Sequence, residues 1–118
     1  MKTFLAVYLG SQNSAQHKEW LTLSEDERKM REAAGMKAWM AWGAKHGNAI
    51  EVNGGPLGKT KHISPRGIAD VRNNMTGFTV IKAESHEAAA RLFEGHPHFS
   101  IFPGEAVEIM EVLPIPGQ

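Results

Sequence analysis

The sequence predicts an α+β fold of the ferredoxin-like βαββαβ type, with two helices on one face of a four-stranded antiparallel sheet. Two observations support this prediction. Strand-like and helix-like segments follow one another in the order strand, helix, strand, strand, helix, strand, which is the split βαβ arrangement. The chain has 118 residues, enough for one domain and too few for two. Residues 1–118 are therefore expected to form a single domain.

The first strand is expected at residues 3–9, where nearly every side chain is apolar. Such a run is typical of a strand that is buried on both faces. As a signal peptide the run is at the short limit, and no A-x-A cleavage site follows it. Residues 11–22 are mostly polar and are expected to form a loop or a short helical turn.

A long helix is expected from Ser24 to about Lys45, followed by a stop at Gly47. Ser24 and Glu27 have the spacing of a capping box, in which each side chain accepts a hydrogen bond from the other residue's backbone N–H. Helical periodicity places several large residues together. Met36, Trp39, Met40 and Gly43 share one face, with Trp42 and His46 at its flank.

The second strand is expected at residues 49–52, and the sequence NGGPLGKT follows at 53–60. Its Gly-Lys-Thr ending resembles a phosphate-binding P-loop, which requires four residues between its two glycines. Gly54 is one residue too close to Gly58, and Pro56 removes a backbone donor. The segment is therefore interpreted as the exit of the second strand.

Residues 58–75 are expected to form a polar connection with turns at 64–67 and 73–74. The third strand is expected at 76–83. Ser85 then caps a second helix that ends at Gly95. The apolar face of this helix consists of Ala88, Ala89, Leu92 and Phe93.

The remaining residues are expected to form a loop at 96–104, a fourth strand at 106–113 and a tail rich in proline. The first and fourth strands are apolar on both faces, whereas the two helices cover only one face of the sheet. Soluble monomers rarely expose a patch of that size. We therefore expect a homodimer whose two sheets pack face to face.

The composition excludes several classes of protein. Thirteen basic and thirteen acidic residues give a formal charge of zero, so nucleic acid is not an expected partner. The chain has no cysteine, which excludes disulfides and thiolate zinc sites and suits a cytoplasmic location. No apolar run is long enough to span a bilayer, so no membrane association is expected.

Three histidines are candidate catalytic residues. His96 and His98 flank Pro97 after the second helix, where they either stabilise the helix end or approach a metal ion. His46 lies at the end of the long helix, as a group stabilised by the helix dipole or as an acid–base catalyst. We expect no metal and no cofactor.

Trp39 and Trp42 are expected to be core residues that also form the edge of a pocket. With the backbone of Gly54, Gly55 and Pro56 they are the predicted ligand-binding residues. Lys59 is included because a loop cation at this place suits an acidic ligand, although a solvated lysine is the simpler interpretation. No G-x-S-x-G motif, catalytic carboxylate pair or cysteine nucleophile is present.

The chain resembles the YCII-related family, in particular its DGPF (YciI-like) branch, within the dimeric α/β barrel superfamily. The resemblance covers nearly the whole chain, and its motifs are diffuse but ordered. They are FLAVYLG at 4–10, LSEDER at 23–28, NGGPLGKTK at 53–61, TGFTVIKAESHEAAARLFEGHP at 76–97 and AVEIMEVLP at 106–114. The resemblance implies a ferredoxin-like subunit that dimerises through its sheet and has a small cleft between sheet and helix.

The family implies a catalytic pair that this chain lacks. Many members have a histidine on the long helix and an aspartate directly before the corner proline. Here residues 38–40 include no histidine, and His96 stands before Pro97. Two hypotheses follow. The chain is a lyase- or isomerase-like enzyme that uses histidine acid–base chemistry on a small aromatic or carboxylate metabolite, or it is a non-catalytic ligand-binding or accessory protein.

Overall fold

The structure is a computed structural model that describes residues 1–117. Its main sheet has four antiparallel strands, β1 (Lys2–Leu9), β2 (Ile50–Pro56), β5 (Met75–Ala83) and β6 (Ala106–Glu111). Their spatial order is β2-β5-β1-β6, with β1 and β5 in the centre. This is the ferredoxin-like order, and the predicted fold class is confirmed.

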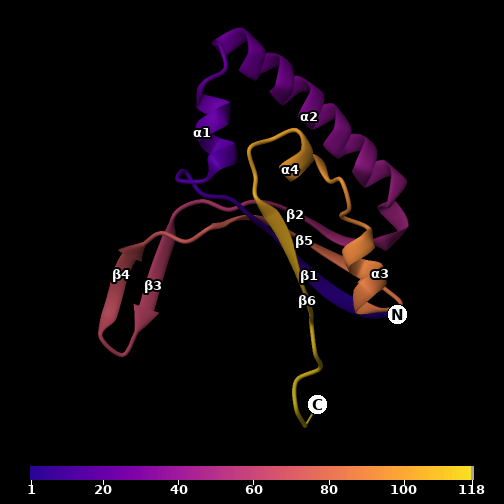
Figure 1. Cartoon of the computed structure of the whole chain (residues 1–118). Helices are drawn as coiled ribbons and strands as arrows, with labels where there is room; N and C mark the ends of the chain where they lie inside the picture. Colours follow the sequence, from indigo (N-terminus) through magenta and orange to yellow (C-terminus); the bar gives the residue numbers. More distant parts are fainter. Residues whose placement is uncertain (118) are drawn as a thin grey trace.

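The helices lie on one side of the sheet (Figure 1). The longest is α2 (Glu25–Lys45), whose capping box is formed as predicted. The Glu27 N–H donates to Ser24 Oγ at 3.1 Å, and the Ser24 N–H donates to Glu27 Oε1 at 3.2 Å. Before it comes α1 (Ala15–Leu21), a full helix where only a loop or turn was expected. A 3-10 turn, η1 (Gly47–Ala49), leads from α2 into β2.

Two short helices follow β5. Helix α3 (His86–Arg91) is capped by Ser85 as predicted, but it ends at Arg91 and not at Gly95. Residues 92–95 form a turn, in which Gly95 has φ of 67°. Helix α4 (Pro97–Ser100) occupies part of the region that was expected to be a loop. It forms because Pro97 stands at its first turn, where no N–H is needed, and His96 caps it.

The connection between β2 and β5 is ordered as a hairpin, a difference from the expected polar loop. Its strands are β3 (Thr60–Ser64) and β4 (Gly67–Val71), joined by a two-residue turn that requires Gly67 at φ of 113°. These strands form a separate two-stranded sheet. Figure 1 shows the hairpin projecting beyond the end of the main sheet.

The core lies between the main sheet and the helices. It consists of Phe4, Ala6, Tyr8, Ile81, Ala83, Ala89 and Phe93, with Trp39 and Trp42 packed against it. The predicted apolar face of α2 is partly wrong, because Met36 and Met40 are 56% and 71% exposed. The buried side is centred on Gly35, where the Phe102 ring lies so close that a Cβ would be 2.5 Å from it.

The opposite face of the main sheet has no helix over it (Figure 1). Side chains of Leu5, Val7 and Val80 alternate with the core residues, and Met110 and Val112 near the chain end are 42% and 52% exposed. The radius of gyration is 16.3 Å, against about 13.5 Å for a compact domain of this length. The excess reflects the projecting hairpin and tail.

Candidate functional site

A cavity of about 410 Å³ opens between α2, α4 and the β2–β5 edge of the sheet. Its walls are mostly apolar and aromatic, with a few polar groups, which is the usual composition of a small-molecule site. The lining residues are Tyr8, Met36, Trp39, Asn53, Gly54, Gly55, Pro56, Thr76, Gly77, Phe78, Thr79, His98 and Phe102.

His98 lines this cavity from α4 and has a defined tautomer. Its Nε2 lies 2.7 Å from the carbonyl oxygen of Leu9, so Nε2 carries the proton and donates it. Burial lowers the pKa of His98, although the bond to Leu9 opposes this shift. The ring is therefore neutral near pH 7, and Nδ1 has a free lone pair.

Nδ1 of His98 is not completely enclosed. It makes no hydrogen bond within residues 1–117. A side-chain nitrogen or oxygen that is completely enclosed and has no partner occurs in that range only at Nε2 of His96. Nδ1 of His98 is therefore not sealed from solvent. A second hollow of about 270 Å³, which includes His17, is also lined by His98. His98 therefore borders two hollows.

The Tyr8 ring packs beside this imidazole, with ring centroids 5.3 Å apart. Thr79 Oγ1 donates to the carbonyl oxygen of Asn53 at 3.2 Å, so the Tyr8 hydroxyl donates to Thr79 Oγ1 at 2.8 Å. Burial raises the pKa of Tyr8, and the phenol remains protonated at neutral pH. The phenolic oxygen is left with lone pairs, so it suits a hydroxyl or N–H donor on a ligand.

His96 has a different environment, although it is only two residues away. Its side chain is fully buried, and Nδ1 accepts from the backbone N–H of His98 at 3.0 Å. The rings of Trp39 and Trp42 stand nearly perpendicular to it, at 4.5 and 4.7 Å. Burial, followed by the nearby His98, lowers the pKa of His96 to about 4. His96 is thus a neutral cap enclosed by aromatic rings.

The Gly-Gly-Pro segment forms one wall of the cavity. It continues β2, which runs to Pro56 instead of ending at residue 52 as expected, and Gly55 and Pro56 pair with Phe78 and Gly77. Gly54 has φ of 66°, and a Cβ there would collide with the backbone of Phe78. Glycine is therefore required for this wall to approach β5. Lys59 is exposed and lies outside the lining.

The remaining predicted residues separate into two groups. Trp39 lines the 410 Å³ cavity, whereas Trp42 lines a neighbouring hollow of about 350 Å³ and donates its indole N–H to the carbonyl of Leu92 at 2.8 Å. His46 packs on Trp42, with ring centroids 5.4 Å apart, and is outside the cavity lining. Burial lowers the pKa of His46, with a smaller contribution from Lys45.

Trp39, Gly54, Gly55, Pro56 and His98, which the sequence predicts as site residues, all line the 410 Å³ cavity. Sequence reasoning missed Tyr8, Thr79 and Phe102. Tyr8 belonged to a strand face that was assigned to the core as a whole, and Phe102 to an expected loop. The signal for Tyr8 was its hydroxyl group, since a buried phenol needs a hydrogen-bond partner.

Two further observations concern residues 1–117. No three histidine, aspartate or glutamate side chains gather there at a spacing suited to a metal ion. None of the helices in that range combines the length and the apolar character needed to cross a bilayer.

Comparisons with known proteins support the fold. No protein-family model matches the sequence, and neither does any curated protein. A solved structure of 5-chloro-2-hydroxyhydroquinone dehydrochlorinase (TftG) from Burkholderia phenoliruptrix AC1100, in complex with 2,5-dihydroxybenzoquinone, is similar. The TM-score is 0.51 at 18% identity, over 92% of this chain and 90% of that chain. At this identity the similarity shows a shared fold.

Proposed function

We propose that this chain is a small-molecule enzyme in which His98 acts as a general base on a planar ring compound. The observation that carries the proposal is the neutral His98 imidazole, which lines an aromatic cavity with Nε2 held by Leu9 and Nδ1 free. A general base must be in the correct tautomer and unprotonated near neutral pH. His98 meets both conditions.

The cavity favours a flat ligand with oxygen substituents. Trp39 and Phe102 supply aromatic surfaces, and the Tyr8 hydroxyl accepts a hydrogen bond. His98 takes a proton from a ring hydroxyl or ring carbon, and the resulting imidazolium returns it at another position. This transfer is the chemistry of a lyase- or isomerase-like enzyme. The similar structure holds 2,5-dihydroxybenzoquinone, a compound of this class.

The proposal extends to family and assembly. The motifs of the YCII-related family, together with a ferredoxin-like fold, support membership of that family. The uncovered apolar face of the sheet supports a homodimer with packed sheets. A cytoplasmic location is consistent with the absence of cysteine.

The test uses 2,5-dihydroxybenzoquinone as the probe. Wild-type protein is expected to bind it, with a rise in melting temperature. In D2O, proton NMR is expected to show faster loss of the ring C–H signal with wild-type protein than with His98→Asn. His62→Asn, which changes a histidine of the projecting hairpin, serves as the matched control and is expected to behave like wild type.

The outcomes separate the enzyme from a binding protein. A second candidate, a ligand-binding protein without catalysis, is favoured by the lack of any carboxylate bound to His98 within residues 1–117. Binding without faster exchange would establish that alternative. No binding of the probe at high micromolar concentration, or equal exchange with His98→Asn, would refute His98 as the base of a ring-compound site.

A further inference from the structure

The hairpin β3–β4 presents an apolar pair that its own subunit leaves exposed. Ile63 stands opposite Ile68 in the ladder, and the two residues are 74% and 71% exposed. The strands pair only with each other, and an isolated two-stranded hairpin is marginally stable in water. Residues 58–73, called the arm below, therefore have the features of a segment that contacts another molecule.

The arm is strongly basic in an otherwise neutral chain. It has four basic residues and one acidic residue, a formal net charge of +3. Lys61 pairs with Asp70 at 2.6 Å within the arm. The other three cations make no ion pair within residues 1–117, and they are Lys59, Arg66 and Arg72.

The last strand and the tail have the opposite character. Residues 105–117, called the C-terminal strip below, contain three glutamates and no lysine or arginine, a formal net charge of −3. None of Glu105, Glu108 and Glu111 makes an ion pair within the described chain. The strip also exposes Leu113 and Ile115, at 69% and 70%, and β6 is an edge strand of the main sheet.

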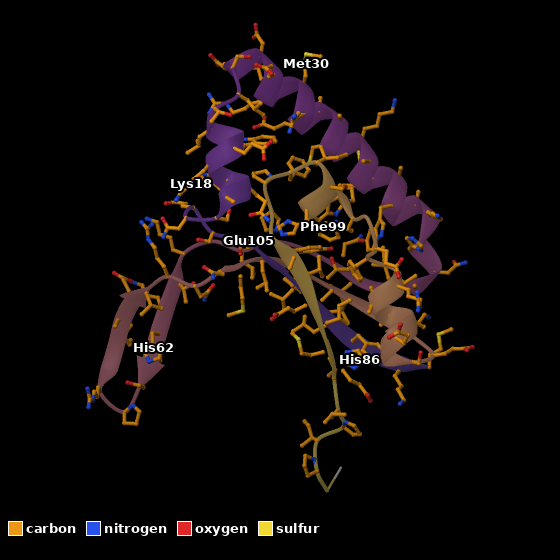
Figure 2. All side chains as sticks on the ribbon, in the orientation of Figure 1. Lys18, Met30, His62, His86, Phe99 and Glu105 are labelled. Carbon is orange, nitrogen blue, oxygen red and sulfur yellow. The ribbon has the colours of Figure 1, made fainter. Side chains whose placement is uncertain are left out.

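The hairpin tip of the arm and the C-terminal end of the strip lie apart within one subunit. Figure 1 shows the hairpin at one end of the molecule and the C-terminus at a separate place, both directed away from α2. Figure 2 shows His62 on the arm well separated from Glu105, where the strip begins. Their complementary charge and apolar surface are therefore not satisfied within the subunit.

We propose that the arm of one copy docks on the C-terminal strip of a second copy. In a two-fold dimer this contact forms twice, so each copy gives and receives an arm. The occupant is a second copy because the chain itself contains a strip whose charge and apolar surface complement those of the arm. The proposal rests on the homodimer of the preceding section, since it describes how that dimer is closed at its edges.

Charge reversal gives a direct test by sedimentation at low salt, where such contacts are least screened. One protein has a reversed arm, and another has a reversed strip. The substitutions are Lys59→Glu, Arg66→Glu and Arg72→Glu in the first, and Glu105→Lys, Glu108→Lys and Glu111→Lys in the second. Each homodimer then opposes like charges, and its dissociation constant is expected to rise by about tenfold or more.

An equal mixture of the two proteins restores both contacts with opposite charges. We expect a heterodimer with an affinity near that of the wild-type dimer. A matched control reverses three cations on the exposed helix surface and is expected to dimerise like wild type. Its substitutions are Lys18→Glu, Arg31→Glu and Lys37→Glu.

The outcomes distinguish this proposal from the dimer itself. A monomeric wild-type protein overturns both. A wild-type dimer whose two reversed forms associate normally, or whose mixture shows no recovery, overturns the docked arm and leaves the face-to-face dimer standing. Binding of 2,5-dihydroxybenzoquinone is measured separately and tests the cavity alone.

A crosslinking experiment locates the contact. The chain has no cysteine, so Arg66→Cys gives a single site for a thiol-linked photocrosslinker, and a 15N-labelled partner distinguishes the two copies. Crosslinks are expected from the arm of one copy to residues 105–117 of the other. Met30→Cys, on α2, is the control and is expected to give none there. Crosslinks within one copy, or to other parts of the partner, would contradict the proposal.

Discussion

Lowering the pH is expected to destabilise this protein through His96. The side chain is fully buried, and its pKa falls from the usual 6.5 to about 4. Between these two values the unfolded chain binds a proton that the folded chain excludes, so stability falls as the pH falls. Integrating one such group from pH 7 to pH 4.5 gives a loss of about 2 kcal/mol.

The assay is urea unfolding followed by tryptophan fluorescence at several pH values between 4.5 and 7. His98 also has a lowered pKa, and its effect has the same sign, so the His96 contribution is isolated by comparison with His96→Asn. Asparagine keeps a side-chain acceptor for the helix cap and does not titrate. Any constant cost of the substitution cancels in the dependence on pH.

Wild type is expected to lose about 2 kcal/mol more than His96→Asn over this range. Equal losses in the two proteins would refute the argument, because His96 would then be protonated as easily in the folded chain as in the unfolded one. A larger loss in the variant would refute it as well.

Three other predictions concern single positions. Gly54→Ala places a side chain at positive φ against a neighbouring carbonyl, and it is expected to lower the free energy of unfolding by at least about 2 kcal/mol. The control Gly43→Ala, with open space around it, is expected to raise that free energy by up to about 1 kcal/mol. Equal effects of the two substitutions would show that the cavity wall tolerates a Cβ. Tyr8→Phe removes the bond to Thr79 and is expected to cost about 1 kcal/mol of stability and to weaken 2,5-dihydroxybenzoquinone binding in calorimetry, and unchanged binding would exclude the hydroxyl from the site. Ser24→Ala removes the capping box and is expected to cost about 1 kcal/mol by thermal unfolding, and an unchanged melting temperature would show that the helix start frays.

The elements predicted well are those specified by neighbouring residues. The capping box of α2 depends on Ser24 and Glu27, three residues apart, and it forms as expected. The start of α3 at its Ser85 cap follows in the same way from local preference. The order of the strands then follows from the small number of ways in which such elements pack.

The errors arise where contacts between residues far apart in the sequence determine the local structure. The rotation of α2 is set by the Phe102 ring against Gly35, 67 positions along the chain, and so Met40 faces solvent although it lies next to Trp39. The different environments of His96 and His98 depend on which ring nitrogen of each residue bonds to the backbone. Spacing alone contains no information about that choice.

The hairpin was missed for a different reason. Its strands are short and mostly polar, and Pro65 and Gly67 were interpreted as an isolated turn. They are the turn of a hairpin whose apolar pair is solvent-exposed within the subunit, so the usual signal of a buried strand face is absent.

The position of the hairpin makes it a separable module. The ladder between β2 and β5 continues to the bond from the Leu57 N–H to the Thr76 carbonyl, at 2.9 Å, before the chain leaves the main sheet. Gly55, Pro56 and Gly77, which line the cavity, lie on the sheet side of that bond. A short turn joining Leu57 to Asn74 would replace the arm, residues 58–73, and leave β5 and its pairing with β1 intact. A change in the length or charge of this insertion is therefore expected to alter which molecules the subunit associates with, and to leave the cavity residues in place.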